Sequence, residues 1–300
     1  MTKVEEWIAE WSKVPRGSLF PGDEEYLKEV ECELKQKRKQ LWETSEAPAE
    51  PRNGRFHRRL SPMPYIGSLK TAKIFLLMWN PSVNAHDYED LTDEVQGLFQ
   101  RNIRQDIELS CCFALKDKRD GIPMQAWTAY FRGPNHGKPS LFGRLIETIR
   151  KRDGDALVKL LETKLAILEL VPYYSQNAEL IRSCRIAEGR ARGPKCPSPS
   201  GLRQGGLPSA QLALAAVKEI AGDHSNLIIP YWSGGSKRWG LKTQGNLNQG
   251  VCAKIVEHQT RNGLNNNVKD AIRAKLRQIA LGRQDQCTTC EGRGHCTACS

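Results

Sequence analysis

Four short apolar runs, each about the length of one buried strand, constrain the fold of this chain most strongly. They are largely continuous rather than alternating, which is typical of parallel strands covered on both faces. The runs cover residues 72–79, 165–173, 227–232 and 251–257. Stretches with helical periodicity lie between or after them, at residues 141–152, 208–221 (with Ser209 as a candidate cap) and 267–281. The sequence therefore predicts an α/β fold, a three-layer α/β/α arrangement with a mostly parallel four-stranded sheet.

The flanks of this body have a different character. Residues 4–12 and 22–44 have the apolar spacing of helices, and residues 46–64 contain four prolines and four arginines, typical of a linker or surface arm. We therefore expect three parts, listed in chain order: a helical N-terminal extension with a basic linker over 1–64, an α/β domain over 65–282, and a cysteine-rich tail over 283–300.

No apolar stretch approaches the roughly 20 residues that cross a bilayer. The first residues mix acids into their apolar positions and lack the apolar core of a signal peptide. These observations favour a cytoplasmic protein, which we expect to act as a monomer without a membrane partner.

Positive charge is concentrated after the first fifty residues. The chain has a net charge of +11, and residues 1–50 hold 12 acids and 8 basic residues, so the remainder carries +15. Basic stretches lie at residues 52–59 and 182–203, and the second includes Arg190 and Arg192 as candidate phosphate contacts. A solvated insertion is the alternative for that stretch. The charge favours nucleic acid as a partner.

Four of the ten cysteines fall in the last fourteen residues, as two CxxC pairs separated by five residues. They are Cys287, Cys290, Cys296 and Cys299. Two such pairs supply four thiolates to one tetrahedral zinc ion, with His295 as an alternative ligand. The segment resembles half of the zinc module of DnaJ-type chaperones over about thirteen residues, which implies a structural zinc ribbon and not chaperone activity. An unmetallated tail is the alternative.

Two motifs at strand ends resemble those of the uracil-DNA glycosylase superfamily. The first apolar run ends in Met78-Trp79-Asn80-Pro81-Ser82, which is similar to the G-x-N-P-G turn of the mismatch-specific branch, with both glycines replaced. After the last run, residues 258–264 keep the histidine and a hydroxyl of the second family motif, H-P-S, with Gln259 in place of its proline. The order of strands and helices over 65–282 also matches that superfamily.

The resemblance implies roles for individual residues. Asn80 would hold the attacking water on a turn fixed by Pro81, and His258 would stabilise the departing base. An exposed Asn-Pro turn and a packing histidine are the structural alternatives. The other implied substrate or DNA contacts are Ser82, Asp87 (general base or exposed turn acid), Tyr88 or Phe113 (stacking on the flipped base), Thr260, and Arg261 or Leu264 (wedge).

Within that superfamily the chain resembles most an anti-phage glycosylase acting on hypermodified cytosine, such as glucosylated hydroxymethylcytosine. That resemblance implies a monofunctional hydrolase that takes part in antiviral defence, with DNA as partner and no catalytic metal. No lysine marks a Schiff-base nucleophile, and the strand ends lack a carboxylate cluster for Mg²⁺, which argues against a nuclease. The alternative is a zinc-ribbon protein that binds nucleic acid without catalysis.

Overall fold

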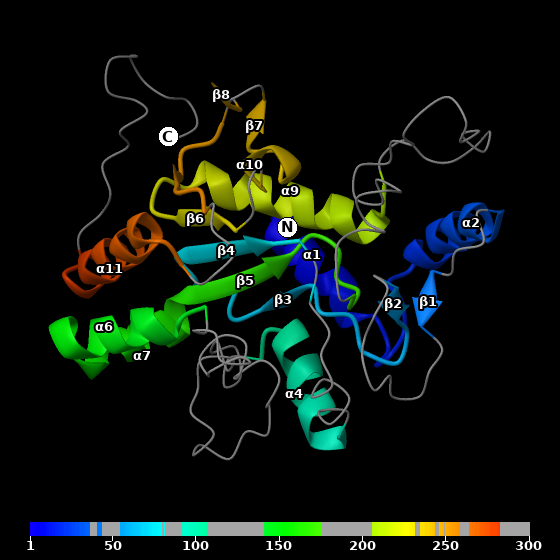
Figure 1. Cartoon of the computed structure of the whole chain (residues 1–300), viewed down its shortest axis with the longest axis horizontal. Helices are drawn as coiled ribbons and strands as arrows, with labels where there is room; N and C mark the ends of the chain where they lie inside the picture. The colour runs from blue at the N-terminus through cyan, green and yellow to red at the C-terminus, as the bar shows by residue number, and fades with distance from the viewer. Residues whose placement is uncertain are drawn as a thin grey trace.

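A five-stranded sheet forms the centre of the described structure (Figure 1). This computed structural model describes residues 1–36, 41–43, 55–79, 81, 92–106, 141–175, 206–231, 235–243, 246–248, 250–258 and 264–282. The strands of the sheet lie in the order β3 (Tyr65–Ile66), β5 (Leu165–Glu169), β4 (Ile74–Met78), β6 (Leu227–Pro230), β9 (Lys254–Ile255). Short pairs β1 (Trp42–Glu43) with β2 (Phe56–His57) and β7 (Lys242–Thr243) with β8 (Asn246–Leu247) lie outside it.

The prediction of a mixed α/β fold with a mostly parallel sheet is confirmed. Strands β5, β4, β6 and β9 run parallel to one another, and β3 pairs antiparallel with β5 at one edge. The expected four strands become five because β3 has only two residues and makes no visible apolar run. Strand β5 ends at Glu169 and β9 spans two residues, so the runs at 165–173 and 251–257 overestimated both strands.

Buried residues of the helices and the sheet form two hydrophobic clusters. The described helices are α1 (Lys3–Ser12), α2 (Asp23–Gln36), α4 (Asp93–Ile103), α6 (Gly143–Asp153), α7 (Asp155–Lys164), α9 (Pro208–Gly222), α10 (Gly235–Arg238) and α11 (Asn266–Ala280). Alternate residues of β4 divide between two buried clusters. Phe75 and Leu77 join the cluster formed with α1 and α9, whereas Ile74, Leu76 and Met78 join the one formed with α6, α7 and α11.

The N-terminal helices share the first of these clusters with the sheet. Trp7 and Trp11 of α1 are almost fully buried, α1 packs along α9, and the Trp7 ring meets Tyr65 of β3 edge-on at 4.9 Å between centroids. The expected helix over 22–44 is wrong at its end, because Trp42 and Glu43 pair with β2. Residues 55–64, expected in a surface arm, bury Phe56 and Met63 completely, so tertiary packing overrides the polar composition there.

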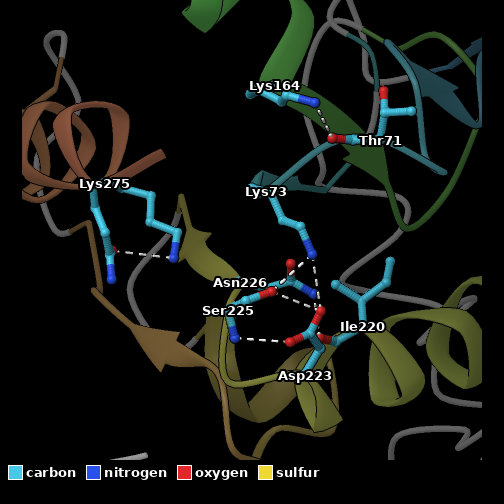
Figure 2. Close-up of polar contacts among 9 residues, drawn as sticks. Thr71, Lys73, Lys164, Ile220, Asp223, Ser225, Asn226 and Lys275 are labelled. Atoms are coloured by element: carbon cyan, nitrogen blue, oxygen red, sulfur yellow. Dashed lines mark hydrogen bonds and ion pairs between the residues drawn. The ribbon is translucent and has the colours of Figure 1, made fainter. Parts of the chain in front are cut away.

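Polar contacts join the residue just before β4 to the residues just before β6, at the amino edge of the sheet (Figure 2). The Lys73 ammonium, just before β4, lies 3.1 Å from the Asp223 carboxylate and donates to the Ser225 hydroxyl at 2.7 Å, both just before β6. Asp223 also accepts from the Ser225 backbone N–H at 2.8 Å. The Asn226 side-chain N–H donates to the carbonyl of Ile220 at 2.8 Å, whereas its side-chain oxygen is buried without a hydrogen-bond partner among the described residues.

A buried carboxyl joins α2, α9 and the chain after β5. The Asp23 carboxyl accepts from the Tyr173 hydroxyl at 2.6 Å, from the Ser209 backbone N–H at 2.9 Å and from the Ser209 hydroxyl. The expectation that Ser209 caps α9 is therefore wrong. Leu207 occupies the cap position, and the Ser209 side chain serves Asp23 instead. Burial raises the pKa of Asp23 to about 6, although these hydrogen bonds oppose the rise.

We expect Asp23→Asn to flatten the pH dependence of stability between pH 4 and 6. In that window the folded wild type retains a proton that the unfolded chain releases, so its stability falls as pH rises, by roughly 3 kcal/mol in total. The asparagine amide does not titrate, and its NH₂ group can donate hydrogen bonds to the hydroxyl oxygens of Tyr173 and Ser209. Urea unfolding at several pH values measures the difference, and parallel profiles for the two proteins would contradict it.

Candidate functional site

The carboxyl edge of the sheet brings together the ends of β4, β5 and β6. Beyond the strands, the chain after β4 continues beside the chain after β5, because Val171 N–H donates to the Trp79 carbonyl at 2.9 Å and Ser175 N–H donates to Pro81 at 3.1 Å. On the other side Tyr231 N–H donates to the Leu77 carbonyl at 3.0 Å. In parallel sheets this edge is where ligands bind, so residues on it are candidates for a site.

Asn80 lies outside the described residues, but both of its neighbours in the chain are described. Trp79 and Pro81 are buried, and their carbonyls accept the two hydrogen bonds from the segment after β5. The two residues that flank Asn80 are thus held at the carboxyl edge.

His258 reaches the same edge from the end of β9. It is completely buried, its backbone N–H donates to the Pro230 carbonyl at 3.1 Å, and its ring stacks on Tyr231 with centroids 4.6 Å apart. The Nδ1 atom accepts from the backbone N–H of Asn265, the residue that caps α11, at 3.4 Å. In a neutral imidazole with Nδ1 as acceptor, Nε2 carries the hydrogen. Burial also raises the pKa of Tyr231 to about 12, so this ring stays a neutral phenol.

Glu169 is a buried acid at this edge. It is the last residue of β5, pairs with Met78 of β4 and is 2% exposed. Within the described part of the chain its Oε2 atom has no hydrogen-bond partner. Burial raises the pKa of this carboxyl well above its ordinary value, which favours its protonated form.

Alternation along β5 places Glu169 on the face of Leu165 and Ile167, which belong to the cluster with α6, α7 and α11. Met78 and Tyr231 belong to the same cluster, and His258 stacks on Tyr231. One face of the carboxyl edge thus carries a buried acid with a raised pKa, a phenol and an imidazole beside the strand that leads to Asn80. Such a set can donate hydrogen bonds to an acceptor-rich heterocycle.

Arg238 of α10 also belongs to this edge. Its guanidinium lies 3.7 Å from the centroid of the Trp79 ring, and Trp79 is the residue that precedes Asn80 in the chain. This cation–π contact therefore links α10, which follows β6, to the residue that follows β4.

Sequence reasoning missed both Glu169 and Arg238, although each left a signal. Glu169 is a lone acid within an apolar strand, a position where charged residues are rare unless they have a role. Arg238 follows the third predicted strand in a basic pair with Lys237.

Of the residues predicted from sequence, the structure describes Pro81, His258 and Leu264. Leu264 is 3% exposed and packs in the same cluster as Met78, so a wedging role would require it to leave the core. The others lie outside the described residues: Asn80, Ser82, Asp87, Tyr88, Phe113, Arg190, Arg192, Thr260, Arg261, Cys287, Cys290, Cys296 and Cys299. Among the residues the structure does describe, no three metal-ligating side chains form a group.

Comparison with known proteins adds no relative. No protein-family model matches the chain, and neither the curated proteins nor the solved structures contain a match. In the described ranges, none of the helices is both long and apolar enough to cross a membrane.

We expect Glu169→Gln to stabilise the protein at neutral and alkaline pH. The raised pKa means that the folded state keeps a proton above the ordinary carboxyl value of 4.5, so wild-type stability declines as pH rises through that window. Glutamine does not titrate, and its advantage should grow by up to about 1.4 kcal/mol per pH unit. Urea unfolding from pH 5 to 9 measures it. The matched control is Glu147→Gln at an exposed position of α6, and an equal effect there would contradict the assignment.

Proposed function

We propose that the protein is a monofunctional DNA glycosylase that removes a modified base, of the hypermodified cytosine type carried by phage DNA, as a cytoplasmic monomer in antiviral defence. The observation that supports it best is the buried Glu169, whose pKa is raised by burial, in register with the strand that leads to Asn80. The proposal includes a three-layer α/β/α core and a zinc ribbon formed by the tail.

The base-recognition step uses the chemistry of a neutral carboxylic acid. A cytosine ring offers an acceptor at N3 next to a donor at N4, and a protonated carboxyl offers the complementary O–H and C=O pair. Glu169 would therefore bind the edge of a cytosine-type base, whereas a carboxylate would only accept. Burial raises the pKa of Glu169 and so favours the protonated form that this recognition needs.

Hydrolysis then follows from the residues at the edge. Asn80 would hold a water against C1′ of the sugar, and the water oxygen bonds to C1′ as the bond from C1′ to the base nitrogen breaks. The electron pair leaves with the base, which takes the Glu169 proton. The water proton passes to solvent, from which Glu169 is reprotonated. His258 would support the charge on the departing base through its ring N–H.

The test incubates full-length protein with duplexes carrying uracil, mismatched thymine, hydroxymethylcytosine or glucosylated hydroxymethylcytosine. We expect release of one free base, measured by mass spectrometry. Asn80→Ala should lower the rate at least about a hundredfold, because water positioning is lost. Glu169→Gln should lower it by a similar factor, because an amide donates a hydrogen bond but transfers no proton.

DNA affinity measured in parallel is the control, and both variants should keep it. Unchanged release by Asn80→Ala would overturn the role of Asn80. Tight DNA binding without release from any substrate would favour the non-catalytic nucleic-acid-binding protein instead.

The four thiols of the tail match the donor set of a structural zinc ion, for which Cys287, Cys290, Cys296 and Cys299 would be the ligands. We expect about one zinc per chain by elemental analysis, lost on replacing Cys287 and Cys290 by serine. Cys252→Ser is the control, because this half-buried cysteine lies outside the tail. Native protein without bound metal would contradict the zinc ribbon.

A further inference from the structure

The start of α2 meets the start of α9 at the buried Asp23 carboxyl. Asp23 is the first residue of α2, and it accepts hydrogen bonds from the Ser209 backbone N–H in α9 and from the Tyr173 hydroxyl after β5. Gly22 allows the two helix starts to come this close, because its φ is +86° and a side chain there would lie 3.2 Å from the Pro208 ring. The N-terminal helices are thus attached to the rest of the protein through one acid.

This carboxyl lies near the balance between its charged and neutral forms. Complete burial favours the neutral acid, whereas three hydrogen-bond donors favour the carboxylate. None of the interactions that shift its pKa, to about 6, comes from a cation. Asp153 differs, because burial raises its pKa but Arg277 and Arg273 lower it overall. Asp23 therefore changes its charge in a pH range where the paired Asp153 stays ionised.

The groups around Asp23 leave it as the titrating member of this contact. Burial and the Asp23 charge raise the pKa of the Tyr173 phenol well above its ordinary value, so this neighbour stays neutral. On α2 itself, Glu24 and Glu25 are exposed. The first turn of α9, residues 208–211, contains no charged residue. Strand β2 packs beside Tyr173 and contributes the buried His57.

The segment that contains Tyr173 also belongs to the carboxyl edge of the sheet. The Tyr173 hydroxyl accepts from the backbone N–H of Phe20, just before α2, at 3.3 Å. On the same segment, Val171 and Ser175 donate their backbone N–H groups to the two residues that flank Asn80. Figure 1 shows α2 on the side toward which β4 and β5 point. Hydrogen bonds thus connect Asp23 through residues 171–175 to the carboxyl edge.

We propose that Asp23 is a proton-dependent clasp, which holds α1 and α2 on residues 171–175 while it is protonated and loosens them when it ionises. The inference goes beyond the proposed function, because it concerns the attachment of these helices whatever reaction the carboxyl edge catalyses. Proton linkage sets the direction. The pKa of Asp23 is about 6 when attached and 3.8 in water, so attachment is strongest below pH 4 and weakens up to pH 6, by up to about a hundredfold.

The test is hydrogen exchange of the full-length protein between pH 4 and 7.5, read by mass spectrometry and corrected for the intrinsic exchange rate at each pH. In the wild type we expect larger opening constants for α2 and residues 170–176 than for β4. These constants should rise by up to about a hundredfold between pH 4 and 6 and then level off. Asp23→Asn should remove this rise, because an amide does not titrate. Glu25→Gln, at an exposed acid of the same helix, is the matched control and should behave like the wild type.

Tyr173→Phe is a second test, which leaves the acid in place. Phenylalanine keeps the ring that packs on Phe56, but Asp23 loses one of the donors that stabilise its charge. The pKa of Asp23 should then rise, so the opening constants should level off above pH 6 instead of at it. If Tyr173 served packing alone, the opening constants would change by the same factor at every pH.

Equal opening constants for α2 and β4 at every pH would overturn the clasp, because the helices would then open only with the whole protein. An unchanged pH dependence in Asp23→Asn would overturn it as well. A response of α2 without one in residues 170–176 would overturn the connection to the carboxyl edge. None of these measurements requires base release, so a failure of the clasp is distinguishable from a failure of the proposed glycosylase.

Discussion

The pairing of β4 between β5 and β6 is the constraint on which the rest of the structure depends. All five residues of β4 are buried, and they divide between two clusters on opposite faces of the sheet. A slip of one residue would exchange these faces, so the register is strongly specified. That register sets Glu169 beside Met78 and brings Tyr231 to the end of β4. The site is thus positioned by core packing.

The two edges of the sheet differ in the kind of polar groups that they bury. At the amino edge Lys73, Asp223 and Ser225 satisfy one another. At the carboxyl edge Glu169 is buried with an oxygen that has no partner among the described residues. An unsatisfied buried acid costs folding free energy, so its presence needs an explanation. The amino edge also buries one oxygen without a partner there, but it belongs to the amide of Asn226 and not to an acid.

The fold class could be predicted from the sequence because a parallel sheet depends on long apolar runs. Periodicity also gave the approximate positions of several elements, namely β4, β6, α1, α9 and α11. It failed where tertiary contacts decide. The two-residue strand β3 has no pattern of its own, and Trp42 leaves the helical pattern to pair with β2. Ser209 has the composition of a helix cap, but it binds Asp23, which is 186 residues away in the chain. For the candidate site, motif spelling selected Pro81 and His258, whose roles stay predictions, whereas the unpartnered oxygen of Glu169 became visible only with its burial.

The contacts of α10 and β7 give one reason why catalysis and DNA binding would be coupled in this chain. Arg238 and Lys242 each touch the residue directly before a predicted catalytic side chain, and three residues separate them. A phosphate near Arg238 would compete with its contact to Trp79, after β4. A phosphate near Lys242 would compete with its contact to Glu257, after β9. Strands β4 and β9 both pair with β6, so the two contacts lie at the ends of strands that share one neighbour.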